Sequence, residues 1–212
     1  MSAAGHLESA PVFLAPLRIE ARAARRGAGA TAVERIGMGP ARATAARARL
    51  EMSLARGRPV VLIGLAGALV AGVRPGDVVV ASSLSTTGTG PVALSAGEEV
   101  AALLEASGLT VHHRPVVSSP VIVSGDAARQ AAAAGGAAAV DMESYWCEPL
   151  ARSRPFAVVR VIVDVPGREL WSPSTLRVGI RAYRSMVVAA RALRQWSPVS
   201  VDGSAFLEVG DL

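Results

Sequence analysis

The chain has 212 residues, of which 51% are hydrophobic and 18% charged, and its formal net charge is +5 at pH 7. This length and composition predict one globular domain, which we place at residues 11–196, with loosely ordered ends at 1–10 and 197–212. The longest apolar run is too short to span a membrane, and no secretion signal is evident. The single cysteine, Cys147, excludes an internal disulfide framework and favours a cytoplasmic protein.

The positive charge does not by itself predict a nucleic-acid partner. The sequence contains no Lys and no Asn, so Arg stands in positions that Lys would otherwise take. The arginines are scattered along the chain, and only 4% of the residues are aromatic, which leaves few side chains on which bases could stack. We therefore expect no nucleic-acid binding.

Short apolar runs alternate along the chain with Ala- and Arg-rich stretches, a pattern typical of alternating strands and helices. Most of the apolar runs lack a period of two, which favours strands covered on both faces. The predicted strands are 12–15, 32–36, 60–64, 78–81, 111–117, 121–123, 137–140 and 157–163. The predicted helices are 40–56, 98–107, 126–134, 143–153 and 173–195. This order predicts an α/β fold, a single three-layer α/β/α domain with a mainly parallel central mixed sheet.

Three carboxylates follow predicted strands, at the sheet edge where α/β proteins bind ligands: Glu20, Glu143 and Asp164. Each also has a structural interpretation. Glu20 suits the first turn of a helix, where the macrodipole favours an acid. Glu143 lies beside a helix start, and Asp164 precedes a turn at Pro166. At the end of a buried strand Asp164 can instead serve as an acid in catalysis, and the residues alone leave these alternatives open.

Two glycine-rich stretches, 34–43 and 61–72, follow predicted strands, and such loops expose backbone N–H groups to a ligand. Neither matches the G-x-G-x-x-G or P-loop pattern, so no dinucleotide or nucleoside triphosphate is indicated. His112 and His113 lack the spacing of metal ligands, and no serine elbow is present. We therefore expect no metal and no cofactor.

Taken in order, several segments resemble those of the nucleoside phosphorylase/nucleosidase superfamily, whose members cleave the N-glycosidic bond of nucleosides. They are "IGLAGAL", "VRPGDVVVA", "VSGD", "AAAVDMESYW" and "VVRVIVD". The resemblance covers about residues 12–192. It implies a nucleoside phosphorylase-like fold and a small-molecule substrate, a purine nucleoside with adenine as its base.

The resemblance also assigns the two catalytic residues. Asp164 would protonate or hydrogen-bond N7 of the purine, which makes the base a better leaving group. Glu20 would orient and deprotonate an attacking water. An acid at the leaving group and a base across the sugar suit the oxocarbenium-like transition state of glycosidic cleavage.

Five further residues form the predicted substrate-binding set. By resemblance, Glu143 would accept hydrogen bonds from the ribose hydroxyls, and Met142 would pack against the sugar. Val140, two residues before Met142, is also placed in this set. Ala66 and Gly67 would contact the base or the sugar through backbone atoms.

The nucleophile is predicted from a difference within the superfamily. Its phosphorylases usually carry an Arg in the strand before the glycine turn, where it binds phosphate, and Leu62 stands at that place here. The sequence therefore favours hydrolysis. Phosphate would be a co-substrate only if Arg18 or Arg42 took over that role.

The substrate beyond the base is predicted from two departures. Leu65 and Val163 stand where methylthioadenosine nucleosidases typically have Ser. The short length and "GMGPARA" resemble instead the hopanoid-associated branch, which is thought to remove adenine from adenosylhopane. We therefore expect an apolar 5′ substituent, with Leu17, Trp146 and Trp171 as candidates to line its site, although at least one Trp is better explained as a core or interface residue.

Other functions stay open at this point. They are a purine nucleoside phosphorylase, a methylthioadenosine/S-adenosylhomocysteine nucleosidase, a futalosine nucleosidase, and a non-catalytic nucleoside-binding protein on the same scaffold. A binding protein has no use for both an acid and a base, so the pairing of Glu20 with Asp164 favours an enzyme. The resemblance further implies a homo-oligomer.

Overall fold

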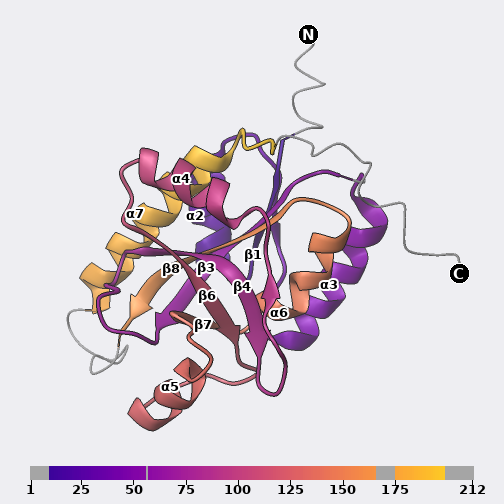
Figure 1. The fold of residues 1–212 in the computed structure, drawn as a ribbon. Helices are drawn as coiled ribbons and strands as arrows, with labels where there is room; N and C mark the ends of the chain where they lie inside the picture. The colour runs from indigo at the N-terminus through magenta and orange to yellow at the C-terminus, as the bar shows by residue number, and fades with distance from the viewer. Residues whose placement is uncertain (1–9, 56, 166–174, 199–212) are drawn as a thin grey trace, which may run out of the picture.

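The computed structural model describes residues 10–55, 57–165 and 175–198, and its strands form one eight-stranded mixed sheet (Figure 1). The strands are β1 (Val12–Ala15), β2 (Val33–Arg35), β3 (Val60–Ala68), β4 (Val78–Thr86), β5 (Val92–Ala93), β6 (Val111–Ser118), β7 (Ala139–Asp141) and β8 (Phe156–Asp164). The helices are α2 (Arg18–Ala28), α3 (Pro40–Ser53), α4 (Gly97–Ala106), α5 (Asp126–Ala133), α6 (Ser144–Cys147), the 3₁₀ helix η1 (Glu148–Arg152) and α7 (Thr175–Leu193).

The strand order is β2-β1-β3-β7-β6-β4-β5, and β8 pairs with both β3 and β4. Because β3 also pairs with β7, the strands β3, β7, β6, β4 and β8 close into a ring. The pairs β3–β7, β4–β5 and β4–β8 are antiparallel, and the remaining five are parallel. The predicted α/β class with a mainly parallel mixed sheet is confirmed.

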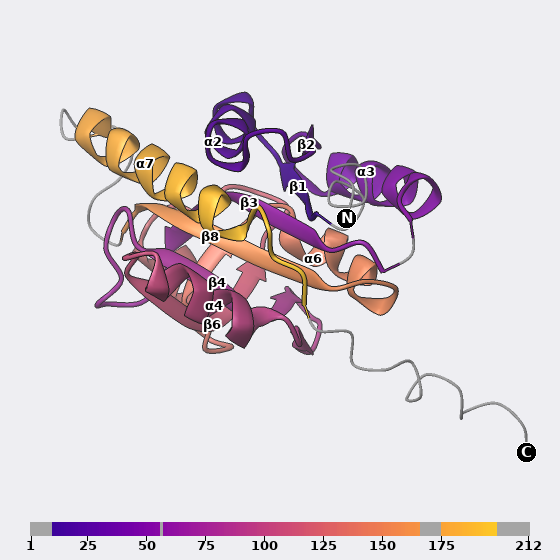
Figure 2. The same cartoon turned by 90° about the horizontal axis from the view of Figure 1, so that it is seen from above.

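Helices cover both faces of the sheet, and each face has its own hydrophobic core (Figures 1 and 2). One core joins the sheet to α3, α6 and η1 through residues such as Leu50 and Leu150. The other joins it to α2, α4 and α7 through residues such as Leu104 and Met186. The central strands β3 and β8 are buried on both faces, which explains their continuous apolar runs.

Three local predictions were wrong. Residues 121–123 form no strand, because Pro120 cannot donate to a ladder and the side chains of Val121 and Ile122 are exposed. A helix over 18–28 was missing from the predicted elements, although Glu20 had been considered as a first-turn residue. The predicted helix 143–153 is divided into α6 and η1 by the proline that follows Glu148.

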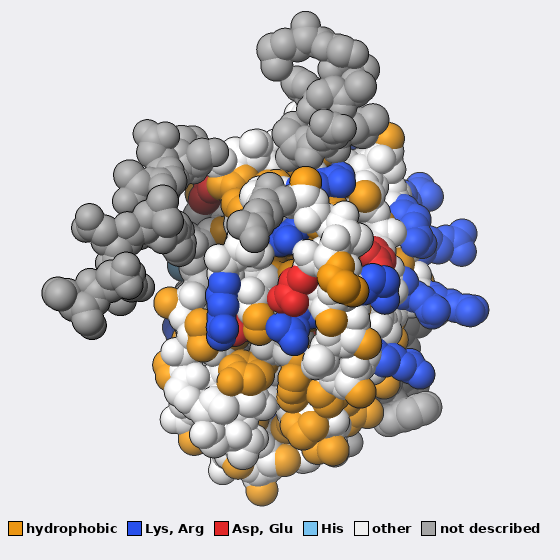
Figure 3. All heavy atoms as spheres, turned by 90° about the vertical axis from the view of Figure 1, so that its right-hand side faces the viewer, with side chains coloured by type: hydrophobic (Ala, Val, Ile, Leu, Met, Phe, Trp, Pro, Cys, Tyr) orange, Lys and Arg blue, Asp and Glu red, His pale blue; other side chains and the backbone are white. Residues whose placement is uncertain are grey.

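The arginines of α3 are surface charges. Arg47 pairs with Glu51 one turn further along the helix, and Arg49 pairs with Glu34 of β2. On the face formed by α3 and α6, the arginines gather toward one edge, and hydrophobic side chains gather over the lower part (Figure 3). Exposed pairs of this kind contribute little to stability.

Within the described ranges, no helix is long and apolar enough to cross a membrane. Over the same residues, no group of three or more His, Cys, Asp and Glu side chains is arranged to hold a metal ion.

The close packing of α2 on α7 depends on Gly27. A Cβ at this position would lie 2.8 Å from the Cβ of Ala190 and would also meet the carbonyl oxygen of Val187. Gly27→Ala should therefore lower the free energy of unfolding by about 1–3 kcal/mol, although alanine is the better helix former. Denaturant unfolding measures this change.

Gly179 provides the matched control, because it is an exposed helical glycine of α7 with nothing within 4 Å of an added Cβ. Gly179→Ala should leave stability unchanged or raise it by up to about 1 kcal/mol. Equal effects of the two substitutions would show that the helix contact at Gly27 is not tight.

Candidate functional site

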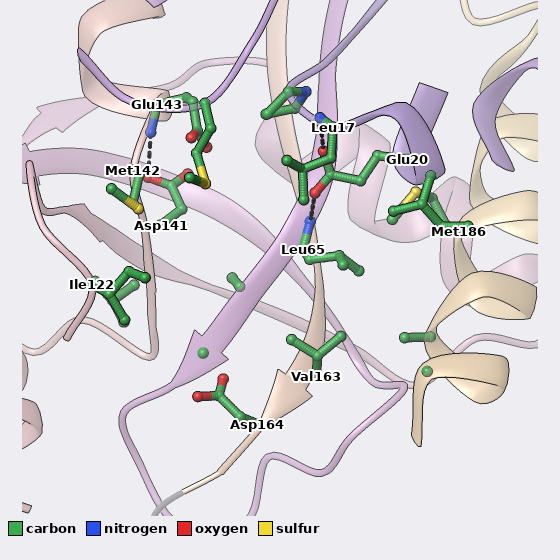
Figure 4. Close-up of a pocket in the computed structure, with 18 of the residues that line it drawn as sticks. Leu17, Glu20, Leu65, Ile122, Asp141, Met142, Glu143, Val163, Asp164 and Met186 are labelled. Atoms are coloured by element: carbon green, nitrogen blue, oxygen red, sulfur yellow. Dashed lines mark hydrogen bonds between the residues drawn. The ribbon is translucent and has the colours of Figure 1, made fainter. Parts of the chain in front are cut away.

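A cavity of about 450 Å³ opens where β1, β3, β7 and β8 end, and carboxylates from different elements lie in its wall (Figure 4). Apolar side chains from α2, α7 and residues 121–123 supply much of the rest of the lining. All seven predicted site residues line this one cavity: Glu20, Ala66, Gly67, Val140, Met142, Glu143 and Asp164. The structure thus brings together residues that are far apart in the sequence, up to the 144 positions between Glu20 and Asp164.

Glu20 is the third residue of α2, and its carboxylate is held by two backbone N–H groups. Leu17 N donates to Oε2 at 2.5 Å, which caps the helix, and Leu65 N of β3 donates to Oε1 at 2.8 Å. Burial raises the pKa of Glu20, and the two backbone hydrogen bonds and Arg160 oppose this rise. The helix-start interpretation and the cavity interpretation therefore both hold, because the same side chain caps α2 and faces the cavity.

Glu143 lies between β7 and α6, and it receives a hydrogen bond from Gly39 N at 3.0 Å on Oε1. Burial raises its pKa from the ordinary 4.5 to about 7. Arg160 lowers the pKa of Glu143, whereas Asp141 and Glu20 raise it further. At neutral pH this side chain is poised between its two protonation states.

Arg160 is the main functional residue that the sequence analysis missed. It lies in the middle of β8 and is 0% exposed. Its Nε is 2.6 Å from Asp141 Oδ2, and its Nη2 is 3.6 Å from Glu143 Oε2. Burial alone would lower the pKa of Arg160. The negative charges of Asp141, Glu143 and Glu20 together have the larger effect, so the pKa of Arg160 is raised. A single arginine inside the apolar run "VVRVIV" was the signal that could have revealed it.

Asp141 fixes the turn that carries Met142 and Glu143. It accepts hydrogen bonds from the Ser118 hydroxyl at 2.5 Å, from the Ser144 hydroxyl, and from the backbone N–H groups of Glu143 and Ser144, each at 3.3 Å. The Ser118 hydroxyl and the two N–H groups are on Oδ1, and the Ser144 hydroxyl and Arg160 Nε are on Oδ2, so the protein occupies both oxygens. Its role is therefore structural, and it sets the direction in which Glu143 points.

The glycines of β3 make room for charged side chains. A Cβ at Gly64 would meet Nη1 of Arg160 and lie 3.1 Å from Glu20 Oε1. A Cβ at Gly67 would lie 2.7 Å from Asp164 Oδ1. The predicted glycine loop over 61–72 is thus mostly strand, because β3 continues to Ala68, and its glycines serve close side-chain approach.

Asp164 ends β8 and lies away from Glu20 and Glu143, at the opposite end of the cavity in Figure 4. Its Oδ2 is 2.5 Å from Nη2 of Arg129, a residue of α5 that is itself 4% exposed. The sequence analysis did not identify Arg129. Its position in the Ala-rich segment after "VSGD" gives no sign that it turns inward.

The two arginines considered as phosphate ligands do not line the cavity. Arg18 and Arg42 are exposed on the surface, and Leu62 is buried in the core below α3. Among the described residues that line the cavity there is no arginine and no histidine.

The three residues predicted to line a site for an apolar substituent, Leu17, Trp146 and Trp171, have different outcomes. Leu17 lines the cavity, whereas Trp146 packs against the core around α3 and α6. Trp171 lies outside the described residues. Apolar lining that the sequence did not reveal comes from α7, including Tyr183 and Met186.

Comparison with known proteins gives a family and a set of similar folds. Residues 19–193 match the sequence model of the phosphorylase superfamily. No curated protein sequence matches the chain. The fold is similar to that of a methylthioadenosine/S-adenosylhomocysteine (MTA/SAH) nucleosidase from Streptococcus pneumoniae, solved with 8-aminoadenine. The TM-score is 0.69 at 16% identity over 86% of this chain and 99% of that chain.

Two further solved structures support the same fold. The MTA/SAH nucleosidase of Campylobacter jejuni has a TM-score of 0.73 at 12% identity, over 88% of this chain and 99% of that chain. The futalosine hydrolase of Helicobacter pylori has a TM-score of 0.68 at 16% identity, over 87% of this chain and 95% of that chain.

The raised pKa of Glu143 predicts how stability depends on pH. Between pH 4.5 and about 7 the native state keeps a proton on Glu143 that the unfolded chain has released. This stabilisation is complete below pH 4.5 and is lost as the pH rises through about 7. Glu143→Gln should therefore flatten the fall in unfolding free energy across this window, by up to about 1.4 kcal/mol per pH unit.

Urea unfolding at a series of pH values measures this slope. Glu99→Gln, on the exposed side of α4, controls for the loss of a carboxylate. A Glu143→Gln variant with the slope of the unsubstituted protein would contradict the assignment of a shifted proton to this site.

Proposed function

The chain belongs to the phosphorylase superfamily and is an enzyme of the nucleosidase or phosphorylase type, and we propose that it hydrolyses the N-glycosidic bond of an adenine nucleoside. The observation that carries this proposal is the placement of Glu20 and Asp164 at different points of one apolar cavity, with Glu143 in the same wall (Figure 4). The proposed reaction needs no metal and no cofactor.

The spacing of the two acids along β3 supports a sugar between them. Glu20 accepts a hydrogen bond from Leu65 N, and Asp164 approaches the backbone at Gly67. These two positions are separated by roughly 7 Å, because a strand rises about 3.3 Å per residue. The two carboxylates thus contact β3 at different points, with Asp164 at the opposite end of the cavity from Glu20 (Figure 4), and the proposed substrate lies between them.

In the proposed reaction, the bond between the anomeric carbon and the base nitrogen breaks, and a bond from that carbon to a water oxygen forms. Glu20 accepts one proton of the water. Asp164 assists the arrival of a proton at N7 of the departing purine. Glu143 accepts hydrogen bonds from the ribose hydroxyls, and Met142 packs against the sugar. Acid–base contributions of this kind typically give about 10²–10⁴-fold each.

Water is favoured over phosphate by the charge of the cavity. Its sugar end carries Glu20 and Glu143, while the positive charge of Arg160 behind them is shared with Asp141. A phosphate dianion at this end would face carboxylates, and no arginine among the described lining residues offsets them. A neutral water has no such cost.

Adenine as the base is supported by the similar folds that are nucleosidases of methylthioadenosine and S-adenosylhomocysteine, one of them solved with 8-aminoadenine. The futalosine hydrolase shows that the same fold also serves another nucleoside. These names leave the 5′ substituent open. Leu65 and Val163 line the cavity, so apolar contacts contribute to its wall where related nucleosidases were expected to have Ser.

An apolar 5′ substituent is supported by the rim of the cavity. Four apolar side chains there are exposed: Ile19 by 52%, Met38 by 46%, Val121 by 65% and Ile122 by 72%. Exposed apolar groups around a cavity mouth are typical of a surface that is covered by a ligand or a partner. A lipid-like adenine nucleoside such as adenosylhopane fits this rim, with methylthioadenosine as the smaller alternative. A homo-oligomer that covers part of the rim is also proposed.

Adenine release with and without phosphate tests the proposed reaction. We expect free sugar and adenine from an adenosyl lipid analogue in phosphate-free buffer. Glu20→Gln should lower kcat by about 10²–10⁴-fold because the water loses its base. Asp164→Asn should lower kcat by a similar factor while leaving substrate affinity within a few-fold. Chromatography of adenine and of the sugar product gives both readouts.

Release that depends on phosphate and yields a sugar 1-phosphate would replace hydrolysis by phosphorolysis. Glu51→Gln, an exposed change on α3, is the matched control for removing a carboxylate.

The rim predicts a preference between substrates. Ile122→Ser should lower kcat/KM for the adenosyl lipid analogue by roughly tenfold, because it removes apolar contact area, and should affect adenosine far less. Met52→Ser is the matched control, since Met52 is 83% exposed and lies away from the cavity. A loss that is equal for both substrates would remove the rim from substrate selection.

A further inference from the structure

Helix α5 turns a single charged side chain inward. Arg129 is its one buried residue, and the other residues of the helix are exposed or half-buried. Figure 1 shows α5 standing off from the sheet at the edge of the molecule. Arginine is rarely buried to this degree unless it is paired, so its surroundings explain why it lies there.

The guanidinium of Arg129 joins the ends of two neighbouring strands. Its Nη1 donates to the carbonyl oxygen of Ala68 at 2.8 Å, at the end of β3. Its Nη2 donates to Oδ2 of Asp164 at 2.5 Å, at the end of β8. One planar group thus fixes the Asp164 carboxyl relative to the strand that also contacts Glu20.

The second oxygen of Asp164 is left for a ligand. Oδ1 would lie 2.7 Å from a Cβ at Gly67, so it sits over the bare backbone of β3. Among the described residues it receives no hydrogen bond. Asp164 lines the cavity, whereas Arg129 does not appear in the lining, so the arginine acts from behind the carboxyl group.

Anchoring of α5 to the sheet is a poor explanation for the buried ion pair between Arg129 and Asp164. Residues Ala132 and Ala133 of α5 already pack against the small cluster of Leu69, Ala137 and Val140. Taking two charges out of water costs more than an apolar contact of the same size, so a buried ion pair is a poor way to anchor a short helix. The pair is explained if the orientation of Asp164 is what it maintains.

We propose that Arg129 is a positioning residue for departure of the base: it binds Oδ2 of Asp164 and so directs Oδ1 toward N7 of the purine. This inference rests on the proposed function. It makes α5, a peripheral helix, part of the machinery that activates the leaving group. Loss of the guanidinium should therefore slow the chemical step and leave sugar binding by Glu143 unaffected.

The test compares two leaving groups. Adenine needs assistance at N7 to depart, whereas nitrophenolate leaves without protonation, so a p-nitrophenyl riboside bypasses Asp164. Arg129→Met should lower kcat for the adenine nucleoside by roughly 10–10³-fold, within the range of acid–base contributions, with KM changed less than a few-fold. For the nitrophenyl riboside kcat should change less than about threefold. Arg129→Lys should recover part of the adenine rate, because it keeps the charge but not the paired geometry.

A double variant separates positioning from folding. If Arg129 acts through Asp164, then Asp164→Asn combined with Arg129→Met should be no slower than Asp164→Asn alone. Gln130→Met, an exposed change on the same helix, controls for loss of a polar group. Thermal unfolding of each variant shows how much of it is folded at the assay temperature.

Three outcomes would overturn the inference. Equal losses for both leaving groups would make Arg129 a structural residue. Multiplicative losses in the double variant would show that Arg129 does not act through Asp164. Absence of adenine release by the unsubstituted protein would remove the proposed function and the inference together, whereas the first two outcomes leave the proposed function intact.

Discussion

The arrangement depends on one buried cation. Arg160 is surrounded by Asp141, Glu143 and Glu20, and a fully buried guanidinium is stable only when acids and hydrogen-bond acceptors satisfy it. Three carboxylates around one arginine leave excess negative charge in a place shielded from water. Burial and the neighbouring acids raise the pKa of Glu143 to about 7, so this carboxyl carries a proton part of the time at neutral pH, which relieves the excess. The protonation of this end of the cavity follows from this balance of charges.

The sheet brings these groups together because its strands converge. β3 contacts Arg160 at Gly64 and Glu20 at Leu65, and two residues after Leu65 it passes Asp164 at Gly67. Because Gly64 and Gly67 have no side chain, a charged group from another element occupies the space beside the backbone at each position. A single strand therefore determines where Glu20 and Asp164 lie relative to each other. The bulge in its pairing with β8, between Ala66 and Gly67, lies where the two halves of the site meet.

Sequence patterns predicted what depends on neighbours in the chain. Apolar runs indicate where strands end, so the three carboxylates predicted from strand ends, Glu20, Glu143 and Asp164, do lie in one cavity. The strand β1 was predicted with its observed limits. The two arginines were not found, because their partners come from distant elements: the apolar run around Arg160 indicates that it is buried but not which acids it meets, and the Ala-rich run around Arg129 gives no sign that it turns inward. Residues 121–123 were misassigned for a related reason: an apolar run resembles a strand whether it faces a sheet or the mouth of a cavity.

The two buried arginines contact acids at different ends of the cavity. Arg160 lies behind Glu20 and Glu143 and offsets the charge of the acids around it, while Arg129 lies behind Asp164 and binds one of its oxygens. Neither arginine lines the cavity, whose rim consists of exposed apolar side chains. Changes in the rim therefore leave the electrostatic balance of the acids intact. Under the proposed function, substrate choice and bond cleavage therefore depend on different contacts.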